Sequence, residues 1–212
     1  MIYFIIALVA VISYLIGSVN FSILISKAIS GKDIRESGSG NAGATNMLRT
    51  HGKKMGVLTL LLDVLKGIIA IIIAMIVDKN IGANTGILSY IAGVCVILGH
   101  NFPLYFGFKG GKGVATSLGV VLMLDWKVGL IVAVCAIAIM AITHYVSLGS
   151  ILGGAAYIVV EIVKAIVTKN YNVIQLVCVV IIGGLLIARH HANIKRLLSG
   201  TENKLSFGKK EK

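Results

Sequence analysis

Long runs of apolar residues, separated by short polar segments, dominate the chain. A predominantly apolar stretch of about 20 residues is long enough to cross a bilayer as a helix. The apolar runs that predict such helices are about 2–26, 55–77, 81–99, 114–124, 128–142, 146–167 and 172–188. The fourth and fifth runs are short for a full crossing, so they form either two thin helices or one bent element. The pattern predicts an all-α, polytopic membrane protein with about seven transmembrane helices.

Composition supports this class. Only 13% of the 212 residues are charged, 57% are hydrophobic and the mean hydropathy is +0.95, whereas soluble domains contain about 25% charged residues. We find no internal repeat, low-complexity tract or soluble segment, so residues 1–212 are predicted to form a single membrane domain.

Basic residues predict the orientation of this domain. Segments 27–54, 100–113 and 189–212 together carry 15 Lys and Arg, whereas the opposite connections carry only Lys79, Lys127, Lys164 and Lys169. By the positive-inside rule the rich side is cytoplasmic, which places the N-terminus outside and the C-terminus in the cytosol. The net charge of +12 is therefore largely a topology signal that also attracts anionic lipid headgroups. It gives no reason to expect a nucleic-acid partner.

Two glycine-rich loops superficially match nucleotide-binding motifs. The stretch "ESGSGNAGATN" (36–46) contains G-x-G-x-x-G, but this fingerprint requires a strand before it and a βαβ unit around it. The polar "KDIRES" precedes the glycines and a membrane span follows, so a dinucleotide site is excluded. The stretch "FGFKGGKGVAT" (106–116) lacks the first glycine and the hydroxyl of a P-loop, which excludes an NTPase loop.

Both loops still suit anion binding. Glycines let the backbone approach a ligand and expose N–H groups, and successive N–H groups at a helix start favour negative charge. Each loop also carries a cation, Arg49 or Lys112, on the predicted cytoplasmic side. Ordinary turn chemistry is the alternative for either loop alone. Together they predict a site for two phosphorylated groups.

A third polar segment, "ARHHANIKRLLSGTEN" (188–203), follows the last span. On a helix, His190 and Asn193 would share one face while Lys195 and Arg196 point elsewhere. The histidine and asparagine could bind polyol hydroxyls. A basic interfacial helix that reaches lipid phosphates is the alternative, but it explains only the two cations.

Several other polar or glycine residues have two possible interpretations. His100 opens the second loop, where a cap or a loop tether is more common than a catalyst. Asp63 and Lys66 lie within a span, and they form either a functional site or a structural pair. Gly149 and Gly153 indicate close helix packing.

The three segments resemble the bacterial acyl-phosphate-dependent glycerol-3-phosphate acyltransferases. The matching pieces are "GSGNAGATN" followed by Arg49, then "GHNFPLYFGFKGGKGVAT", and "RHHANIKRLLSGTE", in the order and spacing of that family. The resemblance covers essentially the whole chain. It implies an integral membrane enzyme that transfers a fatty acyl group from acyl phosphate to the sn-1 hydroxyl of glycerol 3-phosphate. The products are lysophosphatidic acid and phosphate, in the first acylation of bacterial phospholipid synthesis.

The resemblance also implies roles for individual residues. Lys112, Arg49 and His190 are the predicted catalytic residues. Ser39, Arg49, Lys112 and Ser147 would bind the phosphate group of glycerol 3-phosphate. His190 and Asn193 would bind its glycerol hydroxyls. The acyl phosphate would be bound by Thr45, Asn46 and the backbone of Gly110, Gly111 and Gly113. Asn41 and Glu202 also match motif positions, without a separate role. Motif register favours His190 over His191 for the hydroxyl.

The chemistry implied by the resemblance requires no cofactor and no metal. An acyl phosphate is a mixed anhydride that is already activated, so the site must supply positioning and stabilisation of developing negative charge. The proton acceptor is either a substrate phosphate oxygen, which we favour, or His190. The H-x-x-x-x-D motif of other glycerol-phosphate acyltransferases is absent.

The implied partners are glycerol 3-phosphate, fatty acyl phosphate, membrane lipid and the soluble enzyme that makes acyl phosphate. The expected location is the bacterial plasma (inner) membrane, with the site at the cytoplasmic face. The alternative is a transporter of a phosphorylated or anionic solute. Such a protein would place its site near the midplane on broken helices, whereas here the candidate residues gather at one face.

Overall fold

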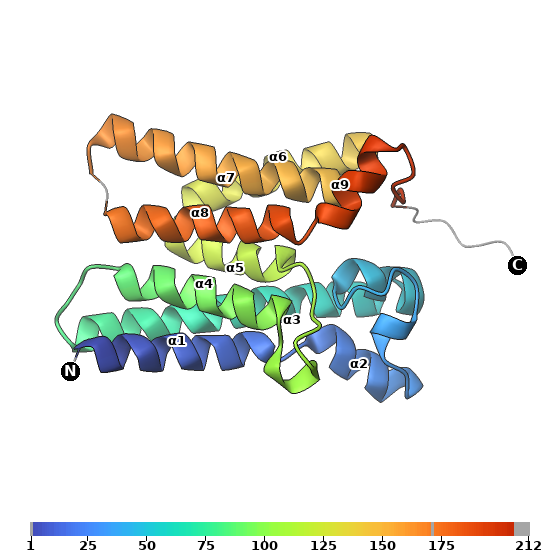
Figure 1. Cartoon of the computed structure of the whole chain (residues 1–212), viewed down its shortest axis with the longest axis horizontal. Helices are drawn as coiled ribbons and strands as arrows, with labels where there is room; N and C mark the ends of the chain where they lie inside the picture. Colours follow the sequence, from blue (N-terminus) through green and yellow to red (C-terminus); the bar gives the residue numbers. More distant parts are fainter. Residues whose placement is uncertain (1, 171, 206–212) are drawn as a thin grey trace, which may run out of the picture.

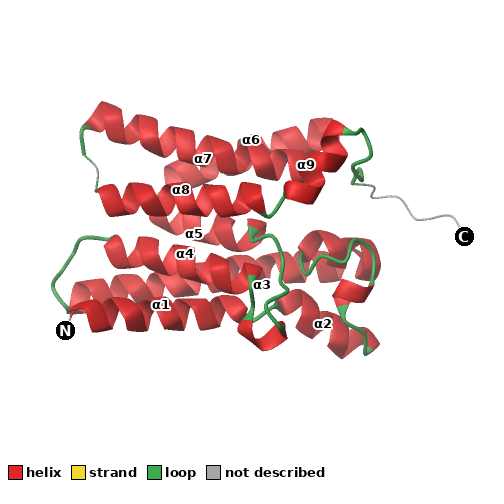
Figure 2. Ribbon diagram, viewed as in Figure 1, coloured by secondary structure: helices red, strands yellow, loops and turns green. Residues whose placement is uncertain are grey.

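The computed structural model describes residues 2–170 and 172–205, which form only helices and connecting loops (Figure 2). In chain order the elements are α1 (Ile2–Ser18), α2 (Phe21–Ser30), η1 (Ile34–Glu36), α3 (Ala44–Asn80), α4 (Ile87–Asn101), η2 (Leu104–Phe106), α5 (Val114–Leu124), α6 (Trp126–Thr143), α7 (Val146–Thr168), α8 (Val173–Ala188) and α9 (His191–Leu198). The predicted all-α class is confirmed.

The long helices lie side by side, and the described parts of the three basic segments are found at the same end of the bundle (Figure 1). Helix α1 packs on α4, α3 on α5, and α6 on α7, while α8 contacts both α4 and α7. The short α5 lies between the group formed by α1, α3 and α4 and the group formed by α6, α7 and α8 (Figure 1). The end that carries residues 31–43, 102–113 and 189–205 is called the motif end below.

Five helical segments of the described chain are long and apolar enough to cross a membrane: Ile2–Ser30, Ala44–Asn80, Ile87–Phe106, Trp126–Thr143 and Val146–Thr168. A sixth forms if α8 and α9, bent by 54°, count as one span. Helix α5 has 11 residues, which at 1.5 Å per residue is about 17 Å, well short of a hydrocarbon core about 30 Å thick. Seven spans and the orientation of the termini therefore stay predictions.

Two predicted spans differ from the structure at the motif end. The first, predicted as one run over 2–26, is broken at Asn20, whose side chain accepts a hydrogen bond from Ile23 N and caps α2. The second was expected to begin at residue 55, but α3 begins at Ala44 and is interrupted at Gly52, where φ is 84°. The polar residues 44–54 therefore belong to a helix that begins after Gly43 without a side-chain cap. Hydropathy gives no signal for this start.

Glycines allow the central helices to approach closely. A Cβ at Gly17 would lie 2.1 Å from Val96 O, and one at Gly119 would lie 2.2 Å from Val64 O. These contacts join α1 to α4 and α3 to α5. The expected packing role of Gly149 is confirmed, since a Cβ there would lie 2.6 Å from Ala136 O. Small residues at such crossings are how membrane helices gain packing contacts.

Candidate functional site

The first glycine loop, residues 37–43, is held in place by Asn46. This side chain is fully buried. Its Oδ1 accepts from Ser39 N at 2.9 Å, and its Nδ2 donates to Ile34 O at 3.1 Å and Ser37 O at 2.9 Å. The polar groups of the Asn46 amide are thus engaged with the loop. Its predicted contact with acyl phosphate stays a prediction.

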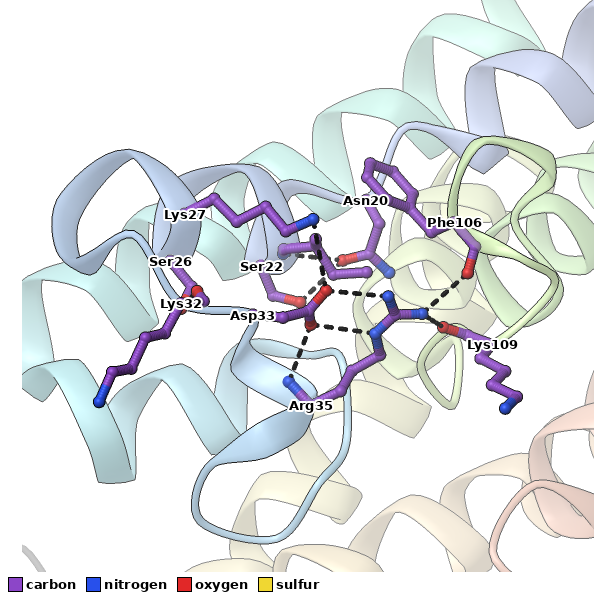
Figure 3. Close-up of polar contacts among 10 residues, drawn as sticks. Asn20, Ser22, Ser26, Lys27, Lys32, Asp33, Arg35, Phe106 and Lys109 are labelled. Carbon is purple, nitrogen blue, oxygen red and sulfur yellow. Dashed lines mark hydrogen bonds and ion pairs between the residues drawn. The ribbon is translucent and has the colours of Figure 1, made fainter.

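An arginine in η1, just before the first loop, binds the second loop. Figure 3 shows the Arg35 guanidinium between the carboxylate of Asp33 and the backbone oxygens of Phe106 and Lys109. Both of these carbonyls accept from Nη1 at 2.8 Å, and Asp33 Oδ2 accepts from Nη2 at 2.8 Å. The hydrogen bond from Arg35 lowers the pKa of Asp33. In the sequence Arg35 is recognisable only as a basic residue, so its contacts with the second loop were not predicted.

The second glycine loop is packed against α4 and against the first glycine loop. A Cβ at Gly110 would lie 2.0 Å from His100 O, and one at Gly111 would lie 2.4 Å from Ala42 O. Gly113 has φ of 82°, a value that favours glycine. Close packing and backbone conformation thus account for all three glycines.

The N–H groups of this loop are only partly available. Gly110 N donates to Asn101 O and Gly111 N donates to His100 O, both at 3.2 Å. The backbone of α4 therefore engages these two N–H groups, and the predicted contact of the loop backbone with acyl phosphate stays a prediction. The N–H groups of Lys112 and Gly113 make no hydrogen bond to any described residue.

A chain of hydrogen bonds links Lys112 to the segment after α8. Lys112 Nζ donates to Asn193 Oδ1 at 2.5 Å, and Asn193 Nδ2 donates to Glu202 Oε1 at 2.6 Å. Ser147 Oγ, at the start of α7, donates to the same carboxylate oxygen at 2.8 Å. Arg196 Nε donates to Glu202 Oε2 at 2.7 Å. Four predicted site residues, Lys112, Asn193, Glu202 and Ser147, are therefore in direct contact.

Three arginines lie close enough to this chain to act on it electrostatically. Burial lowers the pKa of Lys112 to about 8; Glu202 opposes this shift, whereas Arg196, Arg49 and Arg189 add to it. Burial acts to raise the pKa of Glu202, but hydrogen bonds from Asn193, Ser147 and Arg196 lower it overall. The site is thus strongly cationic around one carboxylate.

The two histidines after α8 have different environments. His190 is buried, at 2% exposure, and its Nδ1 lies 2.7 Å from Leu186 O. A carbonyl only accepts, so Nδ1 carries the proton. Burial lowers the pKa of His190 to about 4, which leaves the ring neutral at pH 7. Its Nε2 makes no hydrogen bond within the described residues, so it can accept one from a ligand. His191 is exposed, with Nδ1 3.1 Å from Ala188 O. Burial beside Lys112 thus distinguishes His190 from His191.

The remaining predicted residues lie at the motif end without direct contact to Lys112. Arg49 is exposed and its Nη2 donates to Asn203 O at 3.4 Å, so it reaches the segment that carries Glu202. The side chains of Ser39, Asn41 and Thr45 make no hydrogen bond within the described residues. Their substrate contacts stay predictions.

Sequence reasoning also missed Arg189. Its Nε and Nη2 donate to Gly111 O at 3.2 and 3.1 Å, and its guanidinium lies 4.9 Å from the centroid of the Phe102 ring. It therefore fixes the residue next to Lys112. Its position beside His190 in the third segment is the sequence signal that could have identified it; otherwise it is recognisable only as a basic residue that contributes to the topology.

The fold and the site define a class: a polytopic helical membrane protein with a cation-rich polar site at one end of its bundle. Residues 7–200 match the family model described as glycerol-3-phosphate acyltransferase. The chain belongs to this family, and the predicted resemblance is confirmed.

Curated relatives and solved structures support the same family. The glycerol-3-phosphate acyltransferase of Clostridioides difficile (strain 630) is 45% identical over 199 residues, covering 93% of this chain and 94% of that protein. The enzyme of Halalkalibacterium halodurans is 45% identical, covering 91% and 92%. Two crystal structures of PlsY (YgiH), an integral membrane glycerol 3-phosphate acyltransferase, are similar to this structure. The glycerol 3-phosphate form has a TM-score of 0.84 at 40% identity, and the lysophosphatidic acid form has a TM-score of 0.79 at 38% identity. Each match covers 95% of this chain and 96% of the PlsY chain. The chain is accordingly an integral membrane protein.

Proposed function

We propose that the protein transfers a fatty acyl group from acyl phosphate to the sn-1 hydroxyl of glycerol 3-phosphate. The observation that carries the proposal is the chain Lys112–Asn193–Glu202–Ser147, surrounded by arginines at one end of the bundle. Cations in a partly buried site suit the phosphates of both substrates. A site at one end of a membrane domain also suits two polar groups that meet at the surface, which argues against a transporter with a midplane site.

The acyl chain has an apolar space beside this site. A cavity of about 130 Å³ lies among α5, α6, α7 and α8, and its lining includes Val114, Ser150, Tyr157 and Leu186. Val114 directly follows Gly113, and the Leu186 carbonyl is the one that binds His190. An acyl chain in this cavity would have its phosphate end near Lys112. We place the acyl tail there.

In the proposed reaction the sn-1 hydroxyl oxygen attacks the acyl carbon, the bond from that carbon to the bridging oxygen breaks, and phosphate leaves. Lys112 and Arg49 stabilise the charge that develops on the phosphate. Asn193 and His190 position the glycerol. His190 Nε2 can accept a hydrogen bond from a hydroxyl, but a pKa of about 4 makes it a weak base. We therefore assign the proton to a substrate phosphate oxygen.

The proposed enzyme works at the cytoplasmic face of the bacterial plasma membrane. Its donor would come from the soluble enzyme that makes acyl phosphate. The test is purified protein in lipid with labelled glycerol 3-phosphate and acyl phosphate. We expect lysophosphatidic acid and phosphate in equal amounts. Label accumulating inside sealed vesicles without product would instead support the transporter.

A further inference from the structure

A buried polar cluster lies next to the site but has no role in the proposed reaction. Asp63 and Lys66 on α3 and His100 on α4 are 1%, 3% and 3% exposed. Lys66 Nζ lies 2.8 Å from Asp63 Oδ1 and 2.9 Å from His100 Nδ1. His100 Nδ1 is 3.6 Å from the same Asp63 oxygen. Asp63 and Lys66, which the sequence leaves open as a functional site or a structural pair, form an ion pair, and His100 joins it.

The cluster also holds the end of α1. Lys66 Nζ donates to Gly17 O at 3.2 Å and to Val19 O at 2.8 Å. These carbonyls belong to the last turn of α1 and the break that follows, where backbone oxygens lack helical partners. A buried charge is costly unless it is paired and hydrogen-bonded. Lys66 meets both conditions, so one ammonium fixes α1, α3 and α4 to each other at the motif end.

These contacts determine the orientation of the His100 ring. Lysine is only a donor, so His100 Nδ1 accepts from Lys66 and the neutral ring carries its proton on Nε2. That Nε2 edge faces the second glycine loop: a Cβ at Gly111 would lie 2.3 Å from it. The His100 carbonyl also accepts from Gly111 N at 3.2 Å. His100 therefore contacts Gly111 through both its ring and its backbone.

Gly111 is held on its other side as well. Arg189 donates to Gly111 O with Nε and Nη2. The peptide groups of Gly111 are thus fixed by His100 at the N–H and by Arg189 at the carbonyl. The next residue is Lys112, whose side chain enters the hydrogen-bond chain with Asn193.

We propose that Asp63, Lys66 and His100 are positioning residues that hold Gly111 against α4 and thereby direct the Lys112 ammonium into the site. The importance of this for acyl transfer rests on the proposed function. The effect on Lys112 itself does not depend on any activity. Lys66 orients the His100 ring, Asp63 balances the charge of Lys66, and the ring sets the position of the loop.

The test is the titration of Lys112, measured in the full-length protein by labelling with an amine-acylating reagent at several pH values and mass spectrometry of the Lys112 peptide. The wild-type midpoint should lie near pH 8. In His100→Asn the amide can still accept from Lys66, but the ring edge at Gly111 is lost. We expect the Lys112 midpoint to rise by about one unit or more, toward the free-lysine value of about 10.4. We also expect kcat to fall by about 10- to 100-fold, because small misplacements of a reacting group cost this much.

Two further variants keep the test decisive. Gly111→Ala places a Cβ against the His100 ring and leaves the buried cluster intact, so it should also raise the Lys112 midpoint. It keeps the test available if His100→Asn fails to fold. Asp78→Asn is the control: Asp78 is a buried carboxylate at the opposite end of α3 that accepts from Gly86 N at 3.1 Å. It should lower thermal stability without moving the Lys112 midpoint.

The outcomes separate the two proposals. A folded His100→Asn or Gly111→Ala protein with an unchanged Lys112 midpoint would overturn the positioning role. A raised midpoint in a protein whose wild type transfers no acyl group would support the positioning role and reject only the proposed function.

Discussion

Glu202 is the centre of the site's hydrogen-bond network, so its removal gives the sharpest test of the site geometry. Its carboxylate accepts from Asn193, Ser147 and Arg196, and the side chain is 5% exposed. Hydrogen bonds to a charged group contribute about 1.5–3 kcal/mol each. The contribution of Arg196 is discounted, because its side chain is 39% exposed and exposed ion pairs contribute at most about 1 kcal/mol.

The two inner hydrogen bonds then give about 3–6 kcal/mol for Glu202→Ala. In Glu202→Gln the amide oxygen can still accept from Asn193 and Ser147, so we expect a loss of only about 1–2 kcal/mol, from the Arg196 contact and the charge. The assay is thermal unfolding of the purified protein in detergent, with Glu36→Ala as the control. Glu36 is an exposed glutamate at the same end of the bundle, and its loss should stay within about 0.5 kcal/mol.

Kinetics provide the second readout. Releasing Asn193 should raise the KM for glycerol 3-phosphate in Glu202→Ala. Equal destabilisation by the alanine and glutamine variants, or a loss below about 1 kcal/mol for alanine, would refute the network as described.

Three other predictions concern the cations, the buried histidine and the topology. Lys112→Ala and Arg49→Ala should each lower kcat/KM by roughly 10- to 100-fold, since each removes a charge-assisted contact worth about 1.5–3 kcal/mol; unchanged kinetics with glycerol 3-phosphate would contradict their role. Because the folded-state pKa of His190 is lowered to about 4, its contribution to stability is present above about pH 6.5 and lost as the pH falls toward 4. That loss is about 3 kcal/mol, and thermal unfolding of His190→Asn should show a weaker pH dependence over this window than the wild type; identical profiles would contradict it. Glu36→Cys and Asn84→Cys, at opposite ends of the bundle, should react with an impermeant thiol reagent from opposite sides of the membrane, with Asn84→Cys reactive from outside intact cells; labelling of both from one side would reject the topology.

Hydropathy alone could predict much of the fold. The apolar run at 146–167 corresponds to α7 within one residue at each end, because burial in lipid demands a continuous apolar helix. The same signal could not locate the break at Asn20 or the early start of α3 at Ala44. Both depend on a cap or a loop interaction, such as the Asn46 side chain bonded to the preceding loop.

The site was predictable to the extent that its residues lie in glycine-rich or polar motifs. Lys112, Asn193 and Glu202 were each identified, and they are in contact although Lys112 and Asn193 are 81 residues apart. Arg35 and Arg189 were not identified, because their partners are backbone oxygens in a distant loop. A backbone carbonyl acceptor cannot be identified from the sequence, because every residue has one. For the same reason the use of the Gly111 N–H by α4 could not be foreseen.

The most direct test of the central claim is a donor comparison with purified protein in lipid. Glycerol 3-phosphate would be supplied with an acyl phosphate, the matching acyl-CoA or the matching acylated acyl carrier protein, each with and without magnesium. The proposal predicts lysophosphatidic acid, with one phosphate released per product, from acyl phosphate alone and without a requirement for magnesium. Robust product from acyl-CoA or acylated acyl carrier protein, or none from acyl phosphate, would contradict it.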